Sequence, residues 1–141
     1  MGECQALLDL YDSTNGTGWY NSSNRDTDSN ICNWYGVACT NIAGQDRVTS
    51  IILISNNLVG TLPSSLSVVD EITTCLLGTN QLSGPLPDAW STWSSIEKFN
   101  VGSNQLSGPL PDAWITWSSI KRFNVSTNQL SGPLPDVWSA W

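Results

Sequence analysis

The sequence has no histidine, and charged residues make up only 12% of its 141 positions. Histidine is the commonest general base and metal ligand, so its absence removes the usual centre of such sites. The sequence also contains no glycine-rich phosphate loop and no G-x-S-x-G motif, and its carboxylates are scattered. We therefore expect no enzymatic activity, no cofactor and no metal site.

Basic side chains are also scarce. The sequence contains five basic and twelve acidic residues, which gives a net charge of -7. Phosphate backbones and anionic lipid surfaces attract clustered Lys and Arg, so this balance argues against nucleic acid and such membranes as partners. No apolar run approaches the roughly 20 residues of a membrane-spanning helix. We expect no direct membrane insertion by this segment.

Four cysteines and three Asn-x-Ser/Thr sequons favour an oxidising, extracellular or cell-surface setting. The glycosylation candidates are Asn15, Asn21 and Asn124. The opening residues, MGECQALL, lack the basic segment and apolar run of a signal peptide. A signal, and any anchor, would then lie outside this chain.

One string of eleven letters recurs along the chain. NQLSGPLPDAW begins at Asn80 and again at Asn104, a near copy begins at Asn128, and a degenerate copy, NNLVGTLPSSL, begins at Asn56. Neighbouring copies start 24 residues apart. A fixed period of this length is typical of a solenoid, in which each unit buries its apolar face against the next.

Within one repeat, apolar and polar residues alternate over a short segment, and a turn-rich segment follows. Phe99-Asn100-Val101 predicts a short strand with one buried face, and the strands of successive units should stack in parallel. The segment S-G-P-L-P cannot lie inside a helix and predicts an extended, turn-rich return path. The asparagine amides can satisfy buried backbone groups of the bend, which predicts an asparagine ladder at Asn56, Asn80, Asn104 and Asn128.

Six of the eight tryptophans share two positions of the repeat, at Trp90, Trp114, Trp138 and at Trp93, Trp117, Trp141. The first repeat places Leu66 and Val69 there, as an interior position would accept. We therefore predict a stacked tryptophan core. An exposed stripe of aromatic rings that binds carbohydrate is the alternative.

The pattern L-x-x-L-x-L-x-x-N-x-L resembles leucine-rich repeats, and L-x-G-x-L-P resembles their plant-type class. The tryptophan-bearing form, LPDAWSTWSSI, is more similar still to the repeats of kinetoplastid surface antigens, a family of anchored or secreted protozoan proteins. The resemblance implies a curved solenoid with short parallel strands on its concave face and irregular or 3-10 turns on its convex side. It also implies binding or antigenic roles at a cell surface.

Residues 1–46 are expected to cap about four repeats over residues 47–141, because a solenoid end would otherwise expose its interior. Leu7, Leu10 and Tyr11 share one side of a predicted helix from Glu3 to Asp12. The segment CNWYGVAC resembles the C-x-W-x-G-V-x-C cap of plant-type ectodomains, which implies a disulfide between Cys32 and Cys39. A metal or redox pair is disfavoured, since no Cys-x-x-Cys spacing occurs.

The other two cysteines have different surroundings. Cys75 occupies the strand position of Phe99 and Phe123, which predicts a buried thiol. Cys4 has no obvious partner. A bridge between Cys4 and Cys75, or pairing of Cys4 with another chain, are the alternatives.

Strand positions that point away from the core should form three columns on the concave face, where leucine-rich repeats usually meet their ligands. The columns are Ser50, Thr74, Lys98, Arg122; Ile52, Leu76, Asn100, Asn124; and Ile54, Gly78, Gly102, Ser126. We predict that the ligand-binding residues are Ile52, Ile54, Thr74, Leu76, Lys98, Asn100, Arg122 and Asn124.

Ile52, Ile54 and Leu76 would form an exposed apolar patch near the cap, which is a typical binding surface. The alternative is that a loop of the cap covers it. Lys98, Lys121 and Arg122 would form a basic strip towards the other end, where a glycan on Asn124 would be an obstruction.

Asp88, Asp112 and Asp136 each follow a proline of the repeat. Each unit supplies only one carboxylate, too few for calcium, so we expect these residues to begin a helical turn.

Two functions fit this pattern. The first is a recognition module that binds a protein or glycan partner through the concave face. The second is an assembly protein whose repeats stack end to end into oligomers or fibres. The chain stops mid-repeat, so it is either a fragment of a longer array or an uncapped end that self-associates through Leu134, Trp138 and Trp141.

Overall fold

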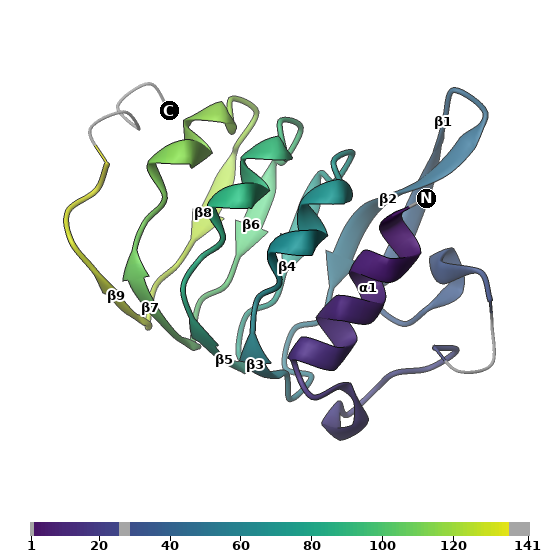
Figure 1. Ribbon diagram of the computed structural model, residues 1–141, viewed down its shortest axis with the longest axis horizontal. Coiled ribbons are helices and arrows are strands. Elements are labelled where there is room, and N and C mark those ends of the chain that lie inside the picture. Colours follow the sequence, from purple (N-terminus) through teal and green to yellow (C-terminus); the bar gives the residue numbers. More distant parts are fainter. Residues whose placement is uncertain (1, 26–28, 136–141) are drawn as a thin grey trace.

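The computed structural model describes residues 2–25 and 29–135, which form a row of stacked coils beside an amino-terminal cap (Figure 1). The cap begins with helix α1, Gly2–Ser13. The strands are β1 Val37–Ile42, β2 Gln45–Ile52, β3 Val59–Thr61, β4 Thr74–Leu76, β5 Gln81–Gly84, β6 Lys98–Asn100, β7 Gln105–Pro109, β8 Arg122–Asn124 and β9 Gln129–Ser131.

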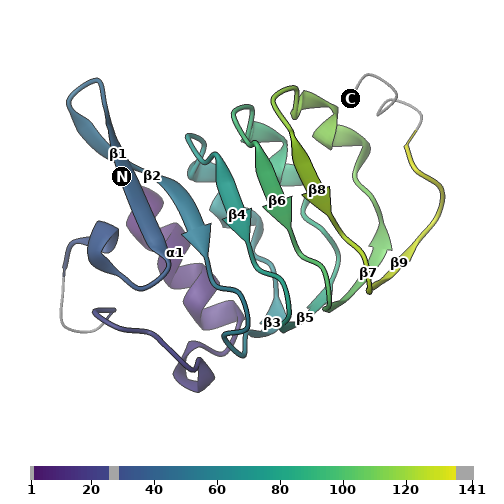
Figure 2. The ribbon, with the colours of Figure 1, turned by 180° about the vertical axis from the view of Figure 1, so that it is seen from behind.

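Two sheets run along the row. The larger has the order β1-β2-β4-β6-β8, in which β1 and β2 form an antiparallel hairpin and the others are parallel (Figure 2). The second, β3-β5-β7-β9, is parallel and follows the predicted extended return path. Residues at the same position of successive repeats do not pair in this sheet, because Ser83 pairs with Gln105 and not with Ser107. Each repeat thus contributes one strand to each of two sheets.

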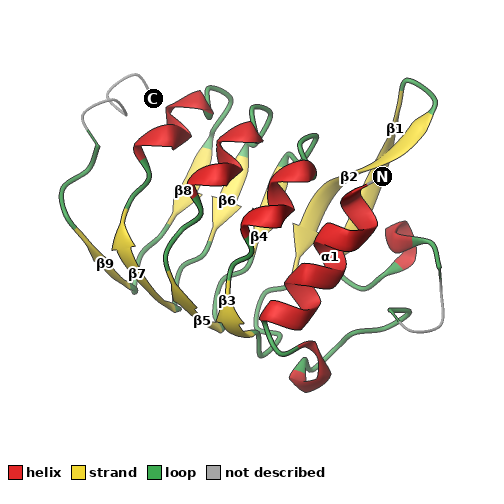
Figure 3. Ribbon diagram, viewed as in Figure 1, coloured by secondary structure: helices red, strands yellow, loops and turns green. Residues whose placement is uncertain are grey.

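Short 3-10 helices lie on the side of the solenoid opposite the larger sheet (Figure 3). They are η3 Ser64–Val68, η4 Asp88–Thr92 and η5 Asp112–Thr116, and the cap adds η1 Gly16–Gly18 and η2 Ile31–Asn33. Pro63, Pro87 and Pro111 directly precede the first three, because a fixed φ suits the start of a helical turn. The predicted solenoid, with strands on one face and 3-10 turns on the other, is confirmed.

The tryptophans fill the interior between the two sides. Trp90, Trp93, Trp114 and Trp117 each have 0% exposure. Within a coil the two rings stack with centroids 4.2 Å apart in the pair Trp90–Trp93 and 4.0 Å apart in the pair Trp114–Trp117. Across coils, Trp90 lies 6.4 Å from Trp114 at an interplanar angle of 3°. An exposed aromatic stripe is therefore wrong for these four; Trp138 and Trp141 lie outside the described residues.

Each buried indole also donates a hydrogen bond to the preceding coil. Trp90 Nε1 donates to the Pro63 carbonyl over 3.0 Å, and Trp114 Nε1 donates to the Pro87 carbonyl over 2.9 Å. In the same way, Trp93 Nε1 donates to the Leu66 carbonyl, and Trp117 Nε1 donates to the Trp90 carbonyl. Identical residues therefore recur because each one packs against its copy and donates a hydrogen bond to a backbone carbonyl of the preceding coil.

Three of the four repeated asparagines, Asn80, Asn104 and Asn128, link neighbouring coils through their side-chain amides. Asn104 Nδ2 donates to the carbonyls of Leu77, Val101 and Gly102, and its Oδ1 accepts from Leu82 N over 2.9 Å. Asn80 and Asn128 repeat this arrangement one coil before and one coil after. Backbone groups at every bend are thereby paired although they are buried.

Asn56 serves the cap instead of a preceding coil. Its Oδ1 accepts from Asn21 N over 2.8 Å, and its Nδ2 donates to the Asn21 carbonyl over 2.8 Å. The first copy of the repeated asparagine thus joins the solenoid to the cap loop.

Helix α1 covers the open end of the first coil with Ala6, Leu7, Leu10 and Tyr11, all buried. A disulfide joins Cys32 to Cys39, as the resemblance implied. The alternative bridge between Cys4 and Cys75 is wrong: both thiols are free, Cys4 being exposed and Cys75 facing the core. Burial raises the pKa of the Cys75 thiol well above its ordinary value, so it packs as a neutral, small apolar side chain.

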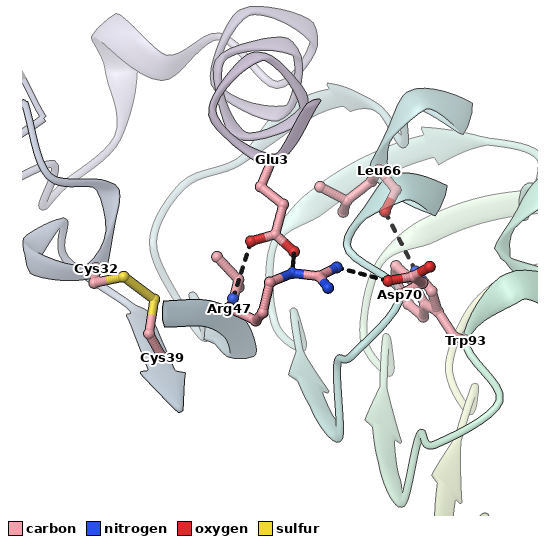
Figure 4. A network of polar contacts seen from close by, with 8 residues as sticks. Glu3, Cys32, Cys39, Arg47, Leu66, Asp70 and Trp93 are labelled. Atoms are coloured by element: carbon pink, nitrogen blue, oxygen red, sulfur yellow. Dashed lines mark hydrogen bonds and ion pairs between the residues drawn. A yellow bond between two sulfur atoms is a disulfide. The ribbon is translucent and has the colours of Figure 1, made fainter. Parts of the chain in front are cut away.

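A charged network fastens the cap helix to the first coils (Figure 4). The buried Glu3 carboxylate accepts from Val48 N over 3.1 Å and from Arg47 Nε over 3.0 Å. Arg47 Nη2 in turn donates to Asp70 over 2.7 Å. Its hydrogen bonds, first to Asp70 and then to Glu3, raise the pKa of the Arg47 guanidinium above its ordinary value.

Replacing Arg47 with methionine should lower the free energy of unfolding by about 2 kcal/mol, because the Glu3 carboxylate loses a charged donor while it stays buried. Asp70→Asn is the matched control: Asp70 is 53% exposed, so its loss should cost less than about 1 kcal/mol. Urea titration measures both values. Equal losses in the two variants would contradict the assigned role of Glu3.

Candidate functional site

The strand register builds the first two of the three predicted columns on the outward face of the larger sheet, called the concave face below. Ser50 pairs with Thr74, Thr74 with Lys98, and Lys98 with Arg122. The second column pairs in the same way through Ile52, Leu76, Asn100 and Asn124. The third column, from Ile54 to Ser126, lies past the strand ends, where Ser55 N donates to the Gly78 carbonyl. It is not a continuous exposed column as predicted, because Gly78 and Gly102 are buried next to the Asn100 amide.

The cap leaves the apolar end of this face open. Ile52 and Ile54 are each 42% exposed, and Leu76 is half-buried. Ile52 N donates to the Gly36 carbonyl over 2.7 Å, so the cap neighbour of Ile52 is a residue without a side chain. Gly36 has a φ of +82°, which disfavours any replacement with a Cβ atom. Of the two alternatives for this patch, the structure shows the exposed one.

The far end of the face is basic and hollowed. Lys98 and Arg122 are exposed and adjacent, whereas Lys121 pairs with Glu97 over 3.3 Å. A hollow of about 480 Å³ opens there. Its lining is Leu76, Lys98, Phe99, Asn100, Arg122, Phe123 and Asn124. Apolar and basic surfaces therefore meet in one continuous site.

Two asparagines at the centre of the site are held by the backbone beside them. Asn100 Oδ1 accepts from Gly102 N over 2.8 Å, and Asn124 Oδ1 accepts from Ser126 N over 2.9 Å. A Cβ atom at Gly78 would lie 3.2 Å from Asn100 Oδ1, so glycine gives this amide its room. Sequence reasoning missed this restraint, although Asn followed two residues later by Gly or Ser is a recognisable signal.

The remaining predicted residues lie apart from this site. Asp88 and Asp112 begin η4 and η5 after their prolines, and Asp136 lies outside the described residues. Over residues 2–25 and 29–135, no group of His, Cys, Asp and Glu side chains could hold a metal ion. No helix in this part of the chain is long and apolar enough to cross a membrane. Leu134 is 70% exposed.

The three sequons differ in their surroundings. Asn15 is exposed in the cap, and Asn21 is half-buried, with its Oδ1 accepting from Ser23 N over 2.9 Å. Asn124 is exposed on the concave face, where its Oδ1 also accepts from Ser126 Oγ over 2.7 Å. A glycan at Asn124 would therefore stand inside the hollow, and a glycan at Asn15 would not.

Comparison with protein families matches residues 2–40 to the leucine rich repeat N-terminal domain. No curated protein matches the sequence. Among solved structures, the ectodomain of the receptor kinase SOBIR1 from Arabidopsis thaliana is similar, with a TM-score of 0.78 and 26% identity. That match covers 93% of this chain and 69% of the other.

Two further structures from Arabidopsis thaliana extend this result. The BIR3–SERK2 complex gives a TM-score of 0.78 and 27% identity, covering 96% of this chain and 73% of that one. The HAESA receptor kinase ectodomain, solved with an IDA peptide hormone ligand, gives a TM-score of 0.74 and 23% identity, covering 98% of this chain and 23% of that one. These matches show that the fold is a leucine-rich repeat solenoid.

Proposed function

We propose that this leucine-rich repeat solenoid is a non-enzymatic recognition module that binds a protein or peptide partner along its concave face. The observation that carries the proposal is the apolar patch formed by the exposed Ile52 and Ile54 and the half-buried Leu76, which adjoins a hollow lined by basic, amide and apolar side chains. Similar structures support it, because one was solved as a complex of two proteins and another with a peptide hormone.

A glycan partner has less support. Carbohydrate sites use aromatic faces as stacking platforms. The four described repeat tryptophans are fully buried, and the concave columns contain no aromatic residue. Phe99 and Phe123 line the hollow, but Phe99 is 1% exposed and Phe123 packs against the core, so neither offers an open ring face. Asn100 and Asn124 can donate to a peptide backbone as readily as to a sugar hydroxyl, so they favour neither class.

The setting we propose is extracellular or at a cell surface, with Asn15, Asn21 and Asn124 as glycosylation candidates. The similar structures are receptor ectodomains, and the chain contains a disulfide, which persists in an oxidising compartment. We also propose that residues 1–46 form a cap in front of about four repeats over residues 47–141. A further hypothesis is that the tryptophan-bearing repeats are related to those of kinetoplastid surface antigens.

Changing Ile52 and Leu76 together to aspartate should abolish partner binding and leave the chain folded, because both side chains project from the sheet face. Thermal unfolding should fall only modestly, by the repulsion between the two aspartates at these opposed positions. The partner can be represented by peptides selected from a random phage-displayed library on the immobilised chain. Binding of the selected peptides is then measured by fluorescence anisotropy for the parent and the variant.

Val68→Asp is the matched control, since Val68 is 44% exposed but lies in η3 on the convex side. Peptides that bind the concave variant as tightly as the parent would refute this face. The competing assembly function predicts a different result: a mass in light scattering that rises with concentration and is unaffected by the concave substitutions. Leu134, at 70% exposure, is the described residue that favours it.

A further inference from the structure

Lys98 and Arg122 place two positive charges side by side on the concave face. They are direct partners in the register of β6 and β8, and parallel strands lie about 4.8 Å apart. Like charges at opposed positions of neighbouring strands destabilise a sheet. Within the described ranges, neither side chain has a carboxylate partner. This arrangement costs free energy until an anion lies between the two cations.

The position of these charges contrasts with the rest of the molecule. The chain carries a net charge of -7, yet two of its five basic residues are uncompensated neighbours on one face. Arg47 and Lys121 are held by carboxylates, and the Arg25 guanidinium lies 4.0 Å from the centre of the Tyr11 ring. None of the twelve concave positions is acidic. An acidic ligand would therefore be attracted to this part of an otherwise acidic protein.

The apolar and basic halves of the face lie at a defined separation. Ile52 and Leu76 are on β2 and β4, and the two cations are on β6 and β8. The centres of the two halves are two strand spacings apart and also two residues apart along the strands, since Lys98 pairs with Thr74 and Leu76 pairs with Asn100; together this gives about 12 Å. An extended peptide advances about 3.3 Å per residue and its side chains alternate between two faces, so side chains about four residues apart match this distance and face the same side.

We propose that the concave face binds an extended peptide that carries an acidic side chain four residues from a large apolar side chain, so that both face the same side. The apolar side chain packs on Ile52 and Leu76, and the carboxylate lies between Lys98 and Arg122. The amides of Asn100 and Asn124, whose Oδ1 atoms are held by the backbone, turn their Nδ2 donors to the peptide between these anchors. This inference rests on the proposed function and names its ligand class.

The test uses the whole chain and short peptides with an acetylated amino end and an amidated carboxyl end. Each peptide carries one leucine and one glutamate at systematically varied separation, with matched peptides in which glutamine replaces glutamate. Anisotropy should show tightest binding at the four-residue separation, and weaker binding at three or five residues, where the two side chains face opposite sides. Glutamine should weaken that binding by up to about tenfold, the range of two exposed ion pairs. Added salt should reduce the difference between glutamate and glutamine.

The variant K98Q/R122Q should erase the preference for glutamate and leave the preference for leucine intact. K121Q is the matched control, because Lys121 is exposed but paired with Glu97 and should keep the preference. Thermal unfolding of the double variant should be equal to or higher than that of the parent, since a like-charge contact is removed.

The outcomes separate this inference from the function on which it rests. Peptide binding that depends on Ile52 and Leu76 but shows no preference for glutamate, or an unchanged preference in K98Q/R122Q, overturns the inference alone. Binding that appears only when the carboxyl end is free also overturns it, because the recognised acid is then terminal. Absence of any peptide whose binding depends on the concave face overturns both.

Discussion

Replacing Trp114 with alanine should lower the free energy of unfolding by about 3–5 kcal/mol, the range for deletion of a buried aromatic ring. Trp114 has 0% exposure, stacks on Trp117 with centroids 4.0 Å apart, and meets Phe99 edge-on at 5.2 Å. Its Nε1 also donates to the Pro87 carbonyl, which would keep only its bond from Trp90 N. The cavity and the lost hydrogen bond act together, at the contact between two neighbouring coils.

Urea titration followed by circular dichroism measures this loss. Trp114→Phe should cost less, because it keeps an aromatic ring and loses mainly the hydrogen bond to Pro87. Tyr20→Ala is the surface control: Tyr20 is 78% exposed, so its change should stay within about 0.5 kcal/mol. A loss at Trp114 no larger than that at Tyr20 would contradict the interior role of the repeated tryptophans.

Replacing Asn104 with alanine should lower the free energy of unfolding by about 2–3 kcal/mol. The side chain is 8% exposed and pairs three carbonyls and one backbone N–H, from two different coils. Leu82 N loses the acceptor that Asn104 supplies, at a cost of about 1–3 kcal/mol, whereas the three carbonyls each keep a second donor, from Asn80, Asn128 or Thr79. Because the amide joins Leu77 of one coil to Val101 of the next, the variant should also weaken the contact between those coils.

Hydrogen exchange at the backbone amide of Leu82, which donates to Asn104 Oδ1, reports this effect locally. It should speed up by more than exchange in helix α1. Gln105→Ala is the control, since Gln105 is the exposed neighbour in sequence and should change neither stability nor exchange by much. Parent-like stability in the Asn104 variant would show that the ladder is dispensable.

Because the sequence repeats, the residues of the core could be predicted from the sequence alone. A unit whose own surface is too small to form a core must bury its apolar face against a neighbour, so identical positions in successive units must lie in contact. Trp90 and Trp114 could therefore be placed in the core, and the columns of the concave face could be written down, without knowing any distance. Each such inference needs only the period and the two-sided alternation of a strand.

The cap has no period, and there the sequence determined less. Arg47 contacts Glu3, 44 residues away, and Asp70, 23 residues away. Nothing in the local pattern of any of the three indicates the others. The sequence also could not show that Cys4 and Cys75 are both free thiols, because it does not reveal whether the cap helix reaches the inward face of a strand.

The sequence by itself determined that this chain is a stack of equivalent coils, which side chains lie inside them and which form columns outside. Only the tertiary structure decided that Gly36 leaves Ile52 open to solvent and that Lys98 and Arg122 lack carboxylate partners within the described residues. Periodic contacts follow from the order of residues, because each unit has the same neighbours. Exposure and charge pairing depend on which unrelated segments come together in space, and that is settled by the folded chain alone.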